Sequence, residues 1–476
     1  MATQPVKPFQ PFWPTTFRGS LTLIAVAGMV VRLAHLIVIA ANNPLSGDAS
    51  SYHLAANLWA DGLGFPEPFR HLFGGTDTVP LSTGGTAVIE TPVGHLERTA
   101  GHPPIWAILL GIFSFLGATS ILEQQVVSAL LGVPAIVFMG LLGREVHSER
   151  LGLLAAAITA SYAFIWVNDG LLMAETPAIA SAVATMLVGV RFWNQPTRRS
   201  AAILGIVGGV AALTRAELVL FLPVVTAVVL IRVALPWRER LLRYVICGLT
   251  SLLICLPWFV RNSTAFDSPV FFSNGMGTVL VQSNCDATYF GSDLGYWNLD
   301  CGLPIPYGVD GSLLSEVERD TVVRERATTY ITEHRKHLLT TVVPARIGRM
   351  WGLYEPIGQL RRDVLADRRS FSVSVLGLFQ FALLVPAAMA GFLVVRRRRG
   401  PLLVLSAWIP IATLTAATTF GNTRYRTAAE TSIVILAAVA LDAAFGWCAS
   451  QRKLSQSGLL IDELTTTAPQ PPGGSS

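Results

Sequence analysis

Residues Ser372–Val395 read SVSVLGLFQFALLVPAAMAGFLVV, and four arginines, Arg396–Arg399, follow directly. The run contains no charged residue and is longer than the roughly 20 residues with which an α-helix crosses a hydrocarbon layer of about 30 Å. Cytoplasmic loops carry an excess of Lys and Arg, so the arginines orient the end of the run toward the cytoplasm. The stretch therefore predicts a transmembrane helix that starts on the external side.

Similar apolar runs recur along the whole chain. Its 476 residues are 52% apolar and 14% charged, with a mean hydropathy of +0.52, whereas soluble domains carry roughly 25% charged residues. The sequence therefore predicts an all-α, polytopic transmembrane helical bundle. The apolar segments are 21–41, 104–118, 125–142, 151–167, 173–190, 200–214, 218–233, 244–260, 372–395, 401–419 and 430–448.

Basic residues orient these eleven segments. Lys7 and Arg18 precede the first segment, and Arg452 and Lys453 follow the last, so we expect both termini in the cytoplasm. Eleven crossings cannot satisfy this, so one segment must fail to span. Pro104–Gly117 is the shortest and begins with two prolines, which predicts a re-entrant segment or one tilted along the interface. Such backbone is tolerated only against protein or a watery cavity.

This orientation divides the chain into cytoplasmic ends, two groups of transmembrane helices and a long external region. The external region is too long for a bare loop and should carry short helices packed on the membrane portion. The tail ends in Pro and Gly residues and should be largely disordered. The parts are the N-terminus 1–20, the core 21–260 with a first external loop 42–103, the external region 261–370, the C-terminal helices 371–448 and the cytoplasmic tail 449–476.

The net charge of +5 does not indicate a nucleic-acid partner, because the arginines stand in short clusters between apolar runs. Two of the five cysteines, Cys285 and Cys301, flank a polar external stretch, while the others lie in apolar runs. A disulfide between these two is expected if the stretch faces an oxidising compartment. Two free thiols are the alternative.

Two acids stand at predicted external helix ends. Asp48 follows the first helix, where a carboxylate is well placed as a general base or metal ligand facing a lipid-borne substrate. Glu175 begins a later membrane helix. Either acid could instead serve its own helix, because Asp is a common N-cap and a helix dipole stabilises an acid in the first turn by about 0.3–1 kcal/mol. His102, before two prolines, is a third candidate or a solvated loop residue.

Arginines on the same predicted side complete the candidate site. A single arginine at a membrane edge commonly reaches toward lipid headgroups. Several of them on one face are more typical of a site for a phosphate or pyrophosphate leaving group, which needs a forked and permanently charged donor. The candidates are Arg215, Arg261 with Asn262, Arg346, Arg424 and Arg426.

In this order, the motifs resemble the integral-membrane glycosyltransferases of the GT-C superfamily, specifically glycosyltransferase family 39 and the aminoarabinose-transferase-like branch. The resemblance extends over nearly the whole chain. Each motif is weak alone, but six stand in the expected order and on one predicted side. They are Gly47-Asp48 with Tyr52, Ala55 and Gly62, then His102-Pro103-Pro104, Glu175, Leu213-Thr214-Arg215, Pro257-Trp258 with Arg261-Asn262, and Arg424-Tyr425-Arg426.

The resemblance implies transfer of a sugar, such as mannose or the pentose arabinose, from a polyprenyl-phosphate donor with inversion at the external face. Asp48 would be the general base and Glu175 a second catalytic acid. The acceptor would be a glycan, lipid or protein of the cell envelope, at a bacterial plasma membrane. A divalent cation is left open, because Ala49 stands where family members often have a second acid. The implied substrate-binding residues are Tyr52, His53, His102, Arg215, Arg261, Asn262, Arg346, Arg424 and Arg426.

A transporter or lipid flippase is the alternative function, since it would also need charges within the membrane. Such a protein should show inverted repeats and broken helices at matched positions, and the sequence shows none. A membrane scaffold without enzymatic activity would not need an acid and arginines gathered on one side.

Overall fold

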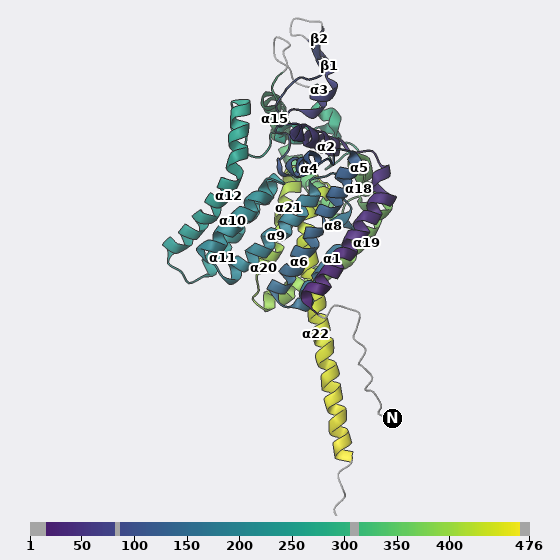
Figure 1. The fold of residues 1–476 in the computed structure, drawn as a ribbon, viewed down its shortest axis with the longest axis vertical. Helices are drawn as coiled ribbons and strands as arrows, with labels where there is room; N and C mark the ends of the chain where they lie inside the picture. Colours follow the sequence, from purple (N-terminus) through teal and green to yellow (C-terminus); the bar gives the residue numbers. More distant parts are fainter. Residues whose placement is uncertain (1–15, 81–85, 305–313, 467–476) are drawn as a thin grey trace, which may run out of the picture.

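The computed structural model describes residues 16–80, 86–304 and 314–466. Figure 1 shows a helical bundle with short helices and a hairpin at one end and the extended α22 at the other. Within the described residues, six helical stretches are long and apolar enough to cross a membrane. They are α1 (Phe17–Val38) with η1 (Ala40–Asn42), α5 (Ile121–Leu131) with α6 (Val133–Val146), α9 (Glu175–Asn194), α12 (Trp237–Phe266), α19 (Phe371–Arg397), and η5 (Thr423–Arg426) with α22 (Thr427–Thr466) as far as Cys448.

The other predicted apolar segments are also helical but shorter. The helix α4 has 11 residues, about 17 Å at 1.5 Å per residue, which is too short to cross a hydrocarbon layer. The expectation that residues 104–117 do not span stays a prediction, because the helices in 151–167, 200–214 and 218–233, which were expected to span, are also short. The shorter helices are α4 (Ile105–Phe115), α7 (Glu149–Ser161), α8 (Ala163–Trp166), α10 (Arg198–Ala212), η2 (Ala216–Leu220), α11 (Phe221–Arg232), α20 (Leu402–Ser406) and α21 (Trp408–Thr418).

Two contacts fix the end of the bundle at which α6 and α7 meet. The guanidinium of Arg144 lies 5.1 Å from the ring centroid of Phe17, the first residue of α1. The Nε atom of Arg150 donates to Asp442 near the far end of the apolar part of α22, at 2.6 Å. The α6–α7 turn therefore lies at the same end of the bundle as the start of α1.

Short elements cover the opposite end. The β-hairpin was not expected from the sequence, and it forms from two antiparallel strands rich in β-branched residues such as Thr76, Thr78, Val88 and Ile89. The elements are α2 (Gly47–Ala60), α3 (Pro68–Phe73), β1 (Gly75–Pro80), β2 (Thr86–Thr91), α13 (Met276–Ser283), α14 (Asp286–Tyr289), η3 (Leu299–Gly302), α15 (Glu316–Glu333), α16 (Arg335–His337), η4 (Leu338–Val342), α17 (Val343–Trp351) and α18 (Pro356–Asp367).

The helix α22 continues beyond the membrane segment to Thr466. Residues 449–466 are therefore helical, although the sequence predicted a largely disordered tail from residue 449. The helix runs on because no proline interrupts it before Pro469. The last part of that tail, 467–476, and residues 1–15 of the N-terminus lie outside the described residues.

Close packing in the bundle fixes the helix ends that carry the site. A Cβ atom on Gly391 of α19 would lie 1.8 Å from the carbonyl oxygen of Leu436 on α22, so only glycine allows this approach. Deeper in the bundle, Arg32 of α1 donates its Nε to Asp169 at 2.6 Å, and both side chains are buried. The second oxygen of Asp169 accepts from Thr176 at 2.7 Å. This pair anchors the chain just before α9 begins at Glu175.

Candidate active site

Four predicted site residues meet at the end of the bundle that the short helices and the hairpin cover. Asp48 lies in the first turn of α2, Glu175 is the first residue of α9, Arg215 lies between α10 and η2, and Arg424 lies in η5. The N-cap of α2 is Ser46, whose hydroxyl accepts from the amide of Ala49. The carboxylate of Asp48 is therefore not used to cap its helix.

Arg424 lies at the centre of this cluster. Its Nε donates to Oε1 of Glu175 at 2.7 Å. Its Nη1 is shared between Oδ2 of Asp48 at 3.0 Å and Oδ1 of Asp367 at 3.2 Å. One guanidinium thus binds three carboxylates from α2, α9 and α18, and it holds together parts of the chain that are far apart in sequence.

Arg215 approaches Glu175 from the other side. Its Nη1 donates to the same Oε1 atom at 2.6 Å, and its Nε donates to Glu217 at 2.6 Å. The Tyr425 ring lies under its guanidinium, 5.5 Å from the ring centroid. Glu175 is 0% exposed, and its Oε2 has no hydrogen-bond partner among the described residues. These contacts make Glu175 a bridge that orients two arginines.

The two carboxylates beside Arg424 differ in environment. The side chain of Asp48 is 41% exposed. Burial raises the pKa of Asp48, but the charge and hydrogen bond of Arg424, with a smaller effect of His102, outweigh burial and leave that pKa below its ordinary value. Asp367 is only 3% exposed. Burial raises the pKa of Asp367 to about 6, although Arg424 and Arg369 oppose this rise.

Tyr52 and His102 lie next to the acids. Their rings are 4.7 Å apart between centroids, and the nearby charges of Asp48 and Glu175 add to burial in raising the pKa of Tyr52. The loop that carries His102 is held from two directions. Arg261 donates to the carbonyl oxygens of Thr99 and Phe65, at 2.7 and 3.0 Å.

Glu316 of α15 holds the same loop from its other side. Its carboxylate accepts from the hydroxyl of Thr99 and the amide of Ala100, at 3.0 and 2.9 Å. These contacts support a role for Arg261 in positioning the His102 loop.

Four other predicted substrate-binding residues have partners outside the cluster. The imidazole of His53 bonds Gln124, and the amide of Asn262 donates to the carbonyl of Val270. Arg346 donates to Ser283, Asn284 and Ala417, which ties α13 to α21. Arg426 bonds Glu430 and the carbonyl of Met350 inside the bundle. Their contacts support structural roles.

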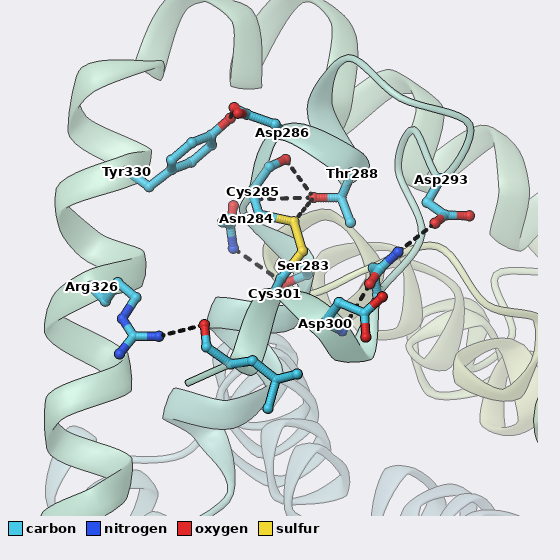
Figure 2. Close-up of a disulfide and its surroundings, with 12 residues drawn as sticks. Ser283, Asn284, Cys285, Asp286, Thr288, Asp293, Asp300, Cys301, Arg326 and Tyr330 are labelled. Carbon is cyan, nitrogen blue, oxygen red and sulfur yellow. Dashed lines mark hydrogen bonds between the residues drawn. A yellow bond between two sulfur atoms is a disulfide. The ribbon is translucent and has the colours of Figure 1, made fainter. Parts of the chain in front are cut away.

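The two polar cysteines are joined. Figure 2 shows the disulfide between Cys285 and Cys301, with a Cα–Cα separation of 6.1 Å, beside the hydroxyl of Tyr330, which donates to Asp286 at 2.6 Å. The other cysteines of the chain are free, and Cys448 is exposed rather than buried in the bundle. The bridge lies in the region that follows α12, which the sequence predicted to be external.

Comparisons with known proteins agree with this architecture. Residues 101–260 match the family described as dolichyl-phosphate-mannose-protein mannosyltransferase. The apo oligosaccharyltransferase of Archaeoglobus fulgidus is similar in structure, with a TM-score of 0.52 and 16% identity over 95% of this chain and 53% of that one. The same organism's AglB, in complex with an inhibitory peptide and a dolichol-phosphate, gives 0.51 and 15%, over 93% and 52%. No curated protein matches the chain.

The fold is that of the GT-C glycosyltransferases. This chain spans about half the length of the oligosaccharyltransferase that it resembles. The matched family segment includes His102, Glu175 and Arg215 but neither Asp48 nor Arg424. The cluster therefore joins residues inside the matched segment to residues outside it.

The GT-C resemblance left open whether a divalent cation binds at this cluster. A cation would need several carboxylate oxygens directed at one free position. Asp48, Glu175 and Asp367 surround one point, but the guanidinium of Arg424 occupies it and binds one oxygen of each. In the described part of the chain, no group of three or more His, Cys, Asp or Glu side chains is arranged to hold a metal ion. The residues of this cluster therefore do not fit a metal centre.

Sequence reasoning missed Asp367, the third carboxylate on Arg424. One signal was present in the sequence. Asp363 and Asp367 stand four residues apart at the C-terminal end of α18, where both the helix dipole and their mutual repulsion disfavour acids. Two acids in so unfavourable a position indicate that tertiary partners compensate them. The identity of those partners could not be read from the sequence.

Proposed function

We propose that this protein is a membrane glycosyltransferase that moves a sugar from a polyprenyl-phosphate donor to an acceptor hydroxyl at the external face. The observation that carries the proposal is the convergence of Asp48, Glu175, Arg215 and Arg424 in a chain of GT-C fold. A base next to two arginines suits a reaction with a hydroxyl nucleophile and a phosphate leaving group.

In the proposed reaction, the acceptor oxygen attacks the anomeric carbon of the donor sugar in line with the phosphate. The bond from that carbon to the acceptor forms while its bond to the phosphate oxygen breaks, which inverts the anomeric configuration. Asp48 takes the hydroxyl proton, and the carrier leaves as polyprenyl phosphate. Its partial exposure gives Asp48 access to an acceptor, and Arg424 keeps it ionised.

The two arginines would stabilise the leaving phosphate. Glu175 holds Nε of Arg424 and Nη1 of Arg215 on one oxygen atom. Among the described residues, Nη2 of neither arginine has a hydrogen-bond acceptor, so both nitrogens are available to phosphate oxygens. We therefore infer that Glu175 positions the arginines and does not transfer a proton itself.

Mannose and pentoses such as arabinose remain the candidate sugars. The match of residues 101–260 to a mannosyltransferase family supports a mannose donor first. The AglB complex contains a dolichol-phosphate, which supports a polyprenyl-phosphate carrier for this chain as well. Envelope glycans, lipids and proteins are all acceptors with a suitable nucleophile. A transporter or flippase is not favoured by any observed contact.

The proposal is tested with the purified protein in nanodiscs, offered polyprenyl-phosphate mannose and arabinose with mixed envelope acceptors. We expect one donor to be consumed and Asp48→Asn, a nearly isosteric change, to abolish transfer while donor binding persists. The control is Asp61→Asn at the exposed end of the same helix, which should be fully active. Retention of more than a tenth of activity by Asp48→Asn, only about 1.4 kcal/mol of barrier, would rule out this base.

A further inference from the structure

Asp367 binds the third side of Arg424 but takes no part in the proposed transfer. Its Oδ1 accepts from the same Nη1 atom that donates to Asp48, at 3.2 Å against 3.0 Å. Its Oδ2 is buried and has no hydrogen-bond partner among the described residues. An ionised carboxylate with an unpaired oxygen in such a place is costly. Its neutral form would be less costly.

The surroundings of Asp367 do not supply a second cation in direct contact. Arg369 is committed elsewhere, since its Nε donates to Asn168 at 3.0 Å and its Nη1 to Thr423 at 2.7 Å. Asp363 accepts from Thr423 and from Gln359. The charged and titratable groups that face Asp367 are Arg424, Arg369, Asp363, Glu175 and Tyr296.

The charge of the cluster opposes an anionic donor. When all groups are ionised, four carboxylates (Asp48, Glu175, Glu217 and Asp367) surround two guanidinium groups (Arg215 and Arg424), so the net charge is 2 − 4 = −2. A phosphodiester adds one more negative charge. Protonation of a single carboxylate would reduce this repulsion.

These carboxylates differ in how many favourable contacts they would give up if they became protonated. Asp48 must stay ionised to act as the base, and Glu175 holds two arginines on one oxygen. Glu217 is a quarter exposed and pairs with Arg215, so solvent already stabilises its charge. Asp367 has one shared hydrogen bond and one unpaired oxygen. Asp367 therefore gives up the least interaction energy when it becomes neutral.

We propose that Asp367 takes up a proton when the donor phosphate binds Arg424, and so acts as a positioning residue that leaves this arginine to Asp48 and the phosphate. The inference rests on the proposed function. Burial already raises the pKa of Asp367 to about 6, and the negative charge of a bound phosphodiester raises it further. Affinity therefore strengthens as pH falls through the pKa of the complex and levels off below about pH 6.

The experiment measures binding of the methyl diester of undecaprenyl phosphate to the protein in zwitterionic nanodiscs. This probe keeps a single charge across the range, so the pH dependence belongs to the protein. We expect the wild-type Kd to tighten by up to about tenfold per pH unit between about pH 7.5 and pH 6. Asp367→Asn should bind at neutral pH at least as tightly as the wild type, with a flat profile.

Two further variants separate Asp367 from its neighbours. Asp363→Asn, one turn earlier on α18 and not bonded to Arg424, should keep the slope with its midpoint moved to lower pH. His102→Gln removes the imidazole whose charge acts on Asp48. The slope assigned to Asp367 should survive in that background.

A measurement on the unmodified protein covers the case in which Asp367→Asn fails to fold. Calorimetry in two buffers of different ionisation enthalpy counts the protons taken up per diester bound, and we expect uptake near pH 6.5. An unchanged slope in Asp367→Asn, or no proton uptake by the wild type, would overturn the inference while leaving the proposed function standing. Failure of the wild-type protein to bind the diester would overturn both.

Discussion

Arg424 and Arg426 stand two residues apart, and their guanidinium groups point in opposite directions. Arg424 binds Asp48, Glu175 and Asp367 at the capped end. Arg426 bonds Glu430 inside the bundle and lies over the Phe381 ring, 3.9 Å from its centroid. Residues two apart in a short turn generally diverge, but only tertiary packing decides which of them faces the site. The sequence could not distinguish the two.

This difference predicts a pair of opposite outcomes for lysine substitution. Arg424→Lys should weaken donor binding at least tenfold, about 1.4 kcal/mol, because one ammonium cannot reproduce the forked contacts to three carboxylates. Arg426→Lys should lower the thermal stability and leave donor affinity unchanged. Affinity for the undecaprenyl phosphate diester and a melting curve for each variant check both outcomes. Full donor affinity in Arg424→Lys would contradict the proposal that donor binding needs the forked guanidinium group of Arg424.

Among the elements, α18 and the region before it show where sequence patterns stop being informative. The helix carries Asp363 and Asp367 toward the cluster from region 261–370, whose length alone predicted short helices there. The β-hairpin and the extension of α22 were missed for a related reason. Both depend on local β-branched content or on the absence of a helix breaker, signals that are weak beside the hydropathy of a membrane segment.

The disulfide between α14 and η3 yields a prediction about thiol content. In denaturant, alkylation before reduction should label three cysteines and after reduction five, because Cys285 and Cys301 are bonded to each other. Denaturation is needed because Cys247 and Cys255 are buried while Cys448 is exposed. Loss of the bridge in Cys285→Ser with Cys301→Ser should destabilise the external region by about 3 kcal/mol, as expected for a loop of this size. Equal labelling in both conditions would mean free thiols.

At the scale of the whole molecule, the fold was predictable because a membrane helix can be recognised from an apolar run of about 20 consecutive residues. The meeting of Asp48, Glu175, Arg215 and Arg424 was also predictable, since each stands near the end of an apolar segment on the same predicted side. Which acid binds which arginine was not predictable from the sequence, because these ion pairs join residues as many as 376 positions apart. Arg346 was predicted on the same side, within region 261–370, and the structure ties it to backbone carbonyls instead.

The orientation of the whole molecule is open to a direct test. Alkaline phosphatase fused after residue 370, just before α19, should be active, because the arginines after α19 predict that this point is external. The same fusion after residue 400, beyond Arg396–Arg399, should be inactive, and a fluorescent protein at the C-terminus should fold in the cytoplasm. The two phosphatase fusions differ by one helix, so each serves as the control of the other. The reverse pattern would put the cluster on the cytoplasmic side.

The single oxygen atom of Glu175 that holds both Arg215 and Arg424 also limits how the protein can evolve. Replacing either arginine removes one of the two cations that bind the buried Glu175 carboxylate, and replacing Glu175 removes the acid that both arginines share; breaking a buried ion pair is typically strongly destabilising. A lineage that loses one of them is therefore under pressure to change another at nearly the same time. Among descendants of this chain, the three positions should vary together or not at all, while Asp61, on the surface of the same cap, drifts freely.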